Sequence, residues 1–279
     1  MKTNYHTHCS HCDGIADPET VVKTAIEKNF DILGFSSHSP LEGEDWTLSP
    51  EGVEDYVSEI NVLKEKYQDQ IQILVGMEMD FIPTEAVWTH NRWKNLDLDY
   101  MIGSVHMVPI VDEYKHLSID GSIEELKELI DLYFKGDVRK MVEAYYDTIA
   151  LMASRETMDF IGHLDVIKKR NRVMGFLNEQ DSWYMHKVCE VLNVIAENNQ
   201  RIEINTGGIS RGATDALYPS QSILKECCKR NIPIVINSDS HNPKYLDGEF
   251  SLAREAALEA GYREQWILDR REWRPLPLK

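Results

Sequence analysis

Short apolar runs alternate with longer segments of helical periodicity along the chain. The runs are rich in β-branched residues and lie around residues 3–5, 31–35, 71–76, 99–104, 158–162, 201–205 and 232–237. Between them, apolar residues recur every three or four positions, as from Val53 to Leu63, which predicts amphipathic helices. Asp17-Pro18 and Ser49-Pro50 each place a capping residue before a proline at an expected first helical position. Seven strand–helix repeats predict a parallel α/β fold.

The repeats run on without a linker, so we expect one domain over residues 1–279. An open, doubly wound sheet and a closed barrel both fit the alternation. We favour a barrel because no glycine-rich dinucleotide loop follows the first strand. The reactive residues also fall where a barrel would bring them together.

The composition limits the classes of partner that this protein can bind. Lys and Arg number 30 against 47 Asp and Glu, which gives a formal net charge of −17. Such a chain repels nucleic acid and anionic membrane surfaces, and no apolar run approaches the roughly 18 residues of a membrane span. The N-terminus has no signal-peptide pattern, and five irregularly placed cysteines do not suit a disulfide framework. We expect a soluble cytoplasmic protein, with homo-oligomerisation left open.

Histidines and carboxylates gather where the expected strands end. They are His6 and His8, His38, Glu78, His106, His163 and Asp165, and Asp239 and His241. Carboxyl ends of parallel strands meet at one mouth, so these residues converge although they are distant in sequence. Imidazole with carboxylate suits zinc, manganese or iron. Because one ion cannot use so many ligands, we predict two or three divalent ions, with Glu78 as a shared bridge.

The same residues resemble the motifs of the polymerase-and-histidinol-phosphatase (PHP) superfamily. His6-Thr-His8, His38, Glu78, His106, His163 and Asp239-Ser-His241 occur in its motif order. Stretches 162–169, 203–211 and 237–243 are similar to stand-alone histidinol-phosphate phosphatases. The resemblance implies a distorted (β/α)7 barrel with a trinuclear metal site at the C-terminal ends of its strands. It also implies hydrolysis of a small phosphate monoester, with L-histidinol phosphate as the first candidate and a protein-tyrosine phosphatase or another small-molecule phosphoesterase as the alternative.

The resemblance further implies three ligand groups. The first is His6, His8, Glu78 and Asp239, the second is Glu78, His106 and His163, and the third is His38 with His241. Superfamily members usually add a histidine to the third group shortly after the first motif, but this chain has Gly14 near that place. We expect Asp13 to take its role, with Asp17 and His11 as alternatives.

Basic residues after two of the expected strands are candidates for binding the phosphate. Arg211 follows the sixth strand and has the planar fork that binds two phosphate oxygens together. Lys168 is the second candidate, and Lys169 and Arg170 compete with it. Metal-activated hydroxide would attack the ester, so no covalent nucleophile is needed.

Asp165 or His38 is expected to protonate the leaving alcohol. The stretch from Met107 to Asp120 is long for a connection after a barrel strand, and is either a substrate lid or a surface insertion. The remaining histidines, His11, His90, His116 and His186, are expected to be ordinary surface or core residues.

Overall fold

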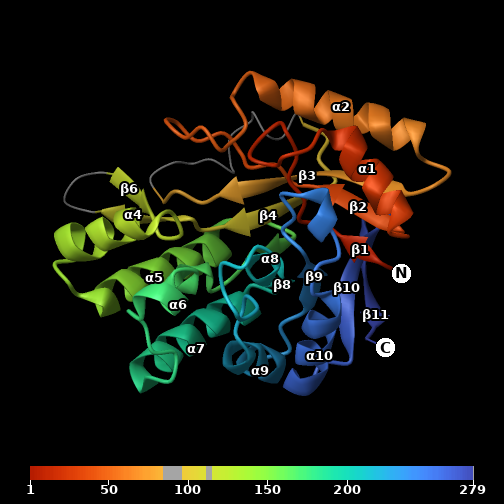
Figure 1. Ribbon diagram of the computed structural model, residues 1–279. Helices are drawn as coiled ribbons and strands as arrows, with labels where there is room; N and C mark the ends of the chain where they lie inside the picture. The colour runs from red at the N-terminus through yellow and green to blue at the C-terminus, as the bar shows by residue number, and fades with distance from the viewer. Residues whose placement is uncertain (84–95, 111–114, 279) are drawn as a thin grey trace.

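The chain folds around one sheet of seven parallel strands (Figure 1). The computed structural model describes residues 1–83, 96–110 and 115–278. The strands follow one another in chain order as β1 (Thr3–Asn4), β2 (Ile32–Phe35), β3 (Gln72–Asp80), β4 (Tyr100–Ser104), β7 (Phe160–Ile161), β8 (Ile202–Asn205) and β9 (Ile234–Asn237). All neighbouring pairs are parallel. This confirms the predicted (β/α)7 architecture.

The first and last strands meet at a junction that we call the seam. Thr7 and Ser240 form one isolated parallel bridge there. Side chains add further hydrogen bonds: Asn4 Nδ2 donates to Ser238 Oγ at 2.8 Å, and Asn237 Oδ1 accepts from Tyr5 N at 2.8 Å. The sheet is therefore nearly closed into a barrel, but this last junction has little backbone pairing.

Helices cover the outside of the sheet (Figure 1). They are α1 (Pro18–Glu27), α2 (Gly52–Lys66), α4 (Ile123–Glu128), α5 (Val138–Arg155), α6 (Asn171–Met174), α7 (Ser182–Glu197), α8 (Gly207–Ser210), α9 (Gln221–Lys229) and α10 (Phe250–Ala260). Single turns lie at Leu129–Tyr133, Val166–Lys168 and Pro243–Tyr245. Their apolar faces pack on the outward side chains of the strands, such as Leu33, Val75 and Ile204.

The helix starts follow the capping signals with one difference. Asp17 caps α1 by accepting a hydrogen bond from Thr20 N at 2.9 Å, and Pro18 is the first helical residue as predicted. Ser49 Oγ accepts from Gly52 N at 3.0 Å, but Pro50 lies in a turn and α2 begins only at Gly52. The Ser49-Pro50 signal therefore marks the approach to the helix and not its first residue.

The side chain of Tyr100 fills the barrel interior. A Cβ at Gly76 would lie 2.3 Å from the ring of Tyr100, and one at Gly34 would lie 2.4 Å from its hydroxyl. Only glycine leaves room for that ring. Strand alternation then places Glu78, two residues beyond Gly76, on the inward side at the open end.

Two antiparallel hairpins complete the fold. β10 (Glu264–Asp269) pairs with β11 (Glu272–Pro277) and contacts the barrel interior through Leu268, whose backbone N–H donates to Tyr5 Oη at 2.9 Å. β5 (Met107–Ile110) pairs with β6 (Lys115–Ser118) in the stretch that we predicted as a lid or insertion. Residues 111–114 lie outside the described part of the chain.

Candidate metal centre

Strand ends and the turns after them carry the cluster that the sequence predicts. His6 and His8 follow β1, His106 follows β4, His163 follows β7, and Asp239 follows β9. Each of these five side chains is at most 7% exposed. Parallel strands thus deliver ligands from distant parts of the chain to one buried spot, as expected for the C-terminal end of a barrel.

Glu78 lies at the centre of this cluster. Its Oε2 is 3.0 Å from His6 Nε2 and 3.1 Å from His38 Nδ1. Its Oε1 is 3.0 Å from His163 Nε2 and accepts a hydrogen bond from Ser104 Oγ at 2.6 Å. The two oxygens therefore face different histidines, which is the arrangement required of a carboxylate that bridges two ions.

The potential ligand atoms form four overlapping groups, in each of which all atoms lie within 4.8 Å of one another. The groups are His6, His8 and Asp239; His6, Glu78 and His163; His8, Asp13, His38 and His241; and His38, Asp80 and His106. Every residue that we predicted as a ligand belongs to at least one group. The groupings differ from the predicted sets: His106 lies with His38 and Asp80, whereas the prediction placed it with Glu78 and His163.

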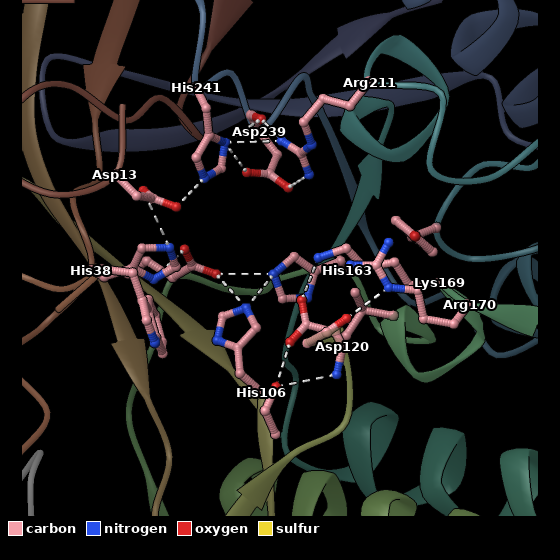
Figure 2. Close-up of a pocket in the computed structure, with 16 residues that line it drawn as sticks. Asp13, His38, His106, Asp120, His163, Lys169, Arg170, Arg211, Asp239 and His241 are labelled. Carbon is pink, nitrogen blue, oxygen red and sulfur yellow. Dashed lines mark hydrogen bonds and ion pairs between the residues drawn. The ribbon is translucent and has the colours of Figure 1, made fainter. Parts of the chain in front are cut away.

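The structure separates the three candidates for the extra ligand. Asp13 Oδ2 lies 2.9 Å from His241 Nε2, inside the cluster (Figure 2). Asp17 caps α1, and His11 pairs with Glu59 at 2.6 Å on the surface. Asp13 is therefore the one candidate that lies with the predicted ligands.

Buried polar atoms in the cluster lack hydrogen-bond partners. They include His6 Nε2, His8 Nε2, His38 Nδ1 and Glu78 Oε2. Such atoms are costly to bury unless something binds them, and all four face the centre of the cluster. Nitrogen and carboxylate donors in this arrangement fit zinc and related divalent ions.

Charges in the cluster shift its pKa values in both directions. Burial lowers the pKa of His6, but Glu203, Glu78 and Asp239 together raise it well above the usual range. Burial and the neighbouring His241 and His38 lower the pKa of His8 to about 3. The cluster is thus a dense mixture of acidic and basic groups, whose protons divalent ions would displace.

An open cavity of about 390 Å³ lies against the cluster, with cationic side chains on its wall. Figure 2 shows Arg211, Lys169 and Arg170 on one side of the pocket and His38 on the other. Arg211 Nη2 donates to Asp239 Oδ2 at 3.0 Å. Lys169 Nζ donates to Asp120 Oδ2 at 2.7 Å, and Arg170 Nε donates to Gly121 O at 2.7 Å. The cavity therefore offers positive charge directly beside the ligand cluster.

Two predicted site residues lie elsewhere. Lys168 is 3% exposed, and its Nζ donates to Asp165 Oδ2 at 2.6 Å and to Leu217 O at 2.9 Å. Asp165 is fully buried and also accepts from Ser220 N at 2.9 Å. Neither residue lines the cavity. The turn Val166–Lys168 directs Lys168 inward as half of a buried ion pair and presents Lys169 and Arg170 to the cavity instead.

Sequence reasoning missed several residues of this site. Asp80 Oδ1 lies 2.5 Å from His106 Nδ1, and Glu203 Oε1 lies 2.8 Å from His6 Nδ1. Asp80 lies on β3 two residues from Glu78, and Glu203 lies on β8 at the start of the stretch 203–211 noted above, so strand alternation was the available signal. Asp120 and Trp46 also line the cavity, and no pattern in the sequence marks them.

Two histidines outside the site have the ordinary surroundings that we expected. His11 pairs with Glu59, and His186, which is 79% exposed, lies 3.3 Å from Glu190. His116 lies on β6 opposite Pro109. His90 lies outside the described residues.

Comparisons with known proteins show what this chain is similar to. The family model described as "PHP domain" matches residues 4–207. The histidinol-phosphatase of Bacillus subtilis is 27% identical over 93% of this chain and 99% of its own length. That of Lactococcus lactis subsp. lactis is 24% identical over 94% of this chain and 93% of its own length.

Solved structures show the same fold. A histidinol phosphate phosphatase from Lactococcus lactis, complexed with zinc, L-histidinol and phosphate, superposes with a TM-score of 0.72. It is 22% identical, and the match covers 98% of each chain. A protein from Listeria monocytogenes superposes with a TM-score of 0.79, at 22% identity, over 90% of this chain and 99% of its own. Within the described residues, no helix has the length and apolar character needed to cross a membrane.

Proposed function

Because this chain belongs to the PHP domain family, we propose that it is a metal-dependent phosphatase that hydrolyses L-histidinol phosphate to L-histidinol and phosphate. Its curated relatives from Bacillus subtilis and Lactococcus lactis carry the name histidinol-phosphatase. The product pair of this reaction occurs with zinc in the Lactococcus lactis structure of the same fold.

One observation supports the proposal above the others: a single cavity is lined both by the ligand cluster and by three cationic side chains. Glu78, His106 and Asp239 line it together with Arg211, Lys169 and Arg170. A phosphate monoester carries a compact double negative charge that needs both kinds of partner. A protein that only stored metal would have no use for the cations.

The proposed ligands are the eight residues of the three implied ligand groups together with Asp13. They are His6, His8, Asp13, His38, Glu78, His106, His163, Asp239 and His241. They would hold two or three divalent ions, zinc, manganese or iron, with zinc supported by the Lactococcus lactis structure. Such ions, when bound, supply an activated water and neutralise charge on the phosphoryl oxygens.

The chain's own residues then orient the ester. Arg211 is positioned to bind phosphoryl oxygens through its planar fork, and Lys169 and Arg170 add charge from the same side of the pocket. Lys169 and Arg170 replace Lys168 in this proposal because Lys168 neutralises Asp165 inside the protein. Of the two predicted proton donors to the leaving alcohol, His38 lines the cavity and Asp165 does not.

The net charge of the protein favours a small substrate. At −17 overall, the protein repels long polyanions, whereas its cavity places three cationic side chains beside the ligand cluster, as one small ester requires. We therefore propose a small-molecule substrate and no nucleic-acid or membrane partner. A biosynthetic phosphatase of this kind would act in the cytoplasm.

A phosphate-release screen tests the proposal. The metal-loaded protein is assayed on L-histidinol phosphate, other amino-alcohol and sugar phosphates, and a phosphotyrosine peptide, each with and without a chelator. We expect the highest kcat/KM on L-histidinol phosphate, loss with chelator and recovery on adding zinc or manganese. A Glu78→Gln variant serves as the inactive control. Preference for the phosphotyrosine peptide would favour the tyrosine-phosphatase alternative, and no activity on any ester would overturn the proposal.

A further inference from the structure

Glu203 is a buried carboxylate that the proposed chemistry does not use. It lies on β8 and is 0% exposed. Among the described residues, no lysine or arginine forms a salt bridge with it, and its one ion-pair partner is His6. A carboxylate taken out of water in this way is strongly destabilising unless hydrogen bonds replace its hydration.

Four donors surround its two oxygens. Oε1 lies 2.8 Å from His6 Nδ1 and accepts from Asn237 Nδ2 at 3.0 Å. Oε2 accepts from His163 N at 2.9 Å and from Asn205 Nδ2 at 2.8 Å. An ionised carboxylate is an acceptor only, with about four lone-pair positions, so this set of donors satisfies it completely.

The neighbouring backbone fixes the direction of both amides. Asn237 Oδ1 accepts from Tyr5 N at 2.8 Å, and Asn205 Oδ1 accepts from Gly207 N at 2.9 Å. Since a backbone N–H can only donate, each amide must turn its oxygen to the backbone and its NH₂ group to Glu203. Apart from His6 Nδ1, whose role depends on its tautomer, no member of the set has a lone pair to offer a protonated Glu203.

With Glu203 ionised, this network determines the tautomer of His6. With an acceptor-only oxygen at Nδ1, the neutral ring must carry its proton there and leave Nε2 as a lone pair. That Nε2 lies 3.0 Å from Glu78 Oε2, at the centre of the ligand cluster. The other oxygen of Glu203 holds the backbone of His163, whose Nε2 lies 3.0 Å from Glu78 Oε1.

We propose that Glu203 is a positioning residue of the metal centre: it fixes the tautomer of His6 and the place of His163, on the two sides of Glu78. The inference rests on the metal-binding part of the proposed function. Carboxylates that hold ligating histidines in this way typically contribute a factor of about 10–100 to metal affinity.

The first test measures metal binding by the Glu203→Gln variant, which keeps the shape but turns an NH₂ group towards donors. We expect zinc affinity, measured by competition with a chromogenic chelator, to fall by about 10–100-fold. Asp159→Asn is the matched control, because Asp159 accepts from Met101 N at 2.8 Å and from Trp273 Nε1 at 2.7 Å, away from the cluster. The control should bind zinc as the wild type does. Equal zinc affinity in Glu203→Gln and the wild type would overturn the inference.

The second test needs no variant. Long-range ¹H–¹⁵N correlation spectra of the zinc-loaded wild-type protein report which nitrogen of His6 carries the proton. We expect protonated Nδ1, and a proton on Nε2 would refute the inference even if Glu203→Gln failed to fold. Failure of the wild type to bind any divalent ion would instead refute the proposed function, so the two failures are distinguishable.

Discussion

Replacing Arg211 by alanine separates phosphate binding from metal binding. The Arg211 guanidinium donates to the backbone oxygen of Asp239 and, at 3.0 Å, to its Oδ2. The other carboxylate oxygen, Oδ1, faces His8 Nε2 at 3.4 Å and His6 Nε2 at 3.7 Å. The substitution therefore removes a cation from the cavity and leaves Asp239 Oδ1 beside the two histidines. It also removes the contact of Arg211 Nη1 with His241 Nδ1 at 2.9 Å, so bound metal must be measured together with activity.

The size of the effect follows from burial. Loss of one preorganised donor to a transition-state oxyanion typically lowers kcat by about 10²–10³-fold, or roughly 2.7–4 kcal/mol. The Arg211 side chain is 30% exposed, so water screens part of this interaction. We therefore expect a loss near the lower end, about 10²-fold in kcat/KM for the phosphate ester.

The assay compares kcat, KM and bound metal in the wild type, Arg211→Ala and Arg211→Lys, all at saturating zinc. Lysine keeps the charge without the planar fork and should recover part of the activity. Arg230→Ala is the matched control, because Arg230 contacts Asn193 and Glu226 on the outer face of α9. Unchanged kcat and KM in Arg211→Ala would refute the phosphate role. A loss of metal in proportion to activity would show that Arg211 acts by holding Asp239.

Three further predictions concern stability and metal removal. Lys168→Met leaves Asp165 buried without its cation and should lower the free energy of unfolding by about 3–5 kcal/mol in urea titrations. Lys169→Met should lower activity with a smaller loss of stability, because its pair with Asp120 is only partly buried. The reverse order would contradict our placement of the two lysines. The Tyr67 hydroxyl, with Lys66 and Lys23, lowers the pKa of Glu19 to about 2, so its stabilisation is present above pH 4.5 and is lost as the pH falls towards 2. The Tm difference between wild type and Glu19→Gln should therefore shrink on acidification, and a constant difference would refute this. Finally, a chelator should lower the Tm of the protein. Free zinc at 100 times its Kd should raise the free energy of unfolding by about 2.7 kcal/mol and restore the Tm. A Tm that does not change with metal would argue against the metal centre.

The strands and most of the cluster were predictable because both depend on local patterns. Buried parallel strands are continuous apolar runs, and their ends are marked by the histidines themselves. All seven predicted runs correspond to strands of the barrel. The positions of Glu78 and His163 then follow from topology, since adjacent parallel strands bring their ends together.

The residues that escaped prediction depend on contacts between distant segments. Lys168 and Lys169 are chemically identical neighbours, and only the single helical turn at Val166–Lys168 decides which one faces the cavity. The β10–β11 hairpin turns at Arg270-Arg271, both at positive φ, where the Asn-Gly or Asp-Gly signal of such turns is missing. Glu203 is one of three polar residues in the run 201–205, and only the fold brings His6 beside it.

The seam between β1 and β9 links metal binding to the local opening of the barrel. His8 N donates to Ser240 O at 2.9 Å and Ser240 N donates to His6 O at 3.1 Å, and these bonds join segments more than 230 residues apart. Because so few bonds join the two edges, the seam should open locally more often than the rest of the sheet. One ion bound by His6 and His8 on one edge and by Asp239 on the other would hold the two edges together and oppose this opening. Amide hydrogen exchange at His8 and Ser240 should therefore slow markedly on zinc binding, while exchange in the β3–β4 ladder stays the same.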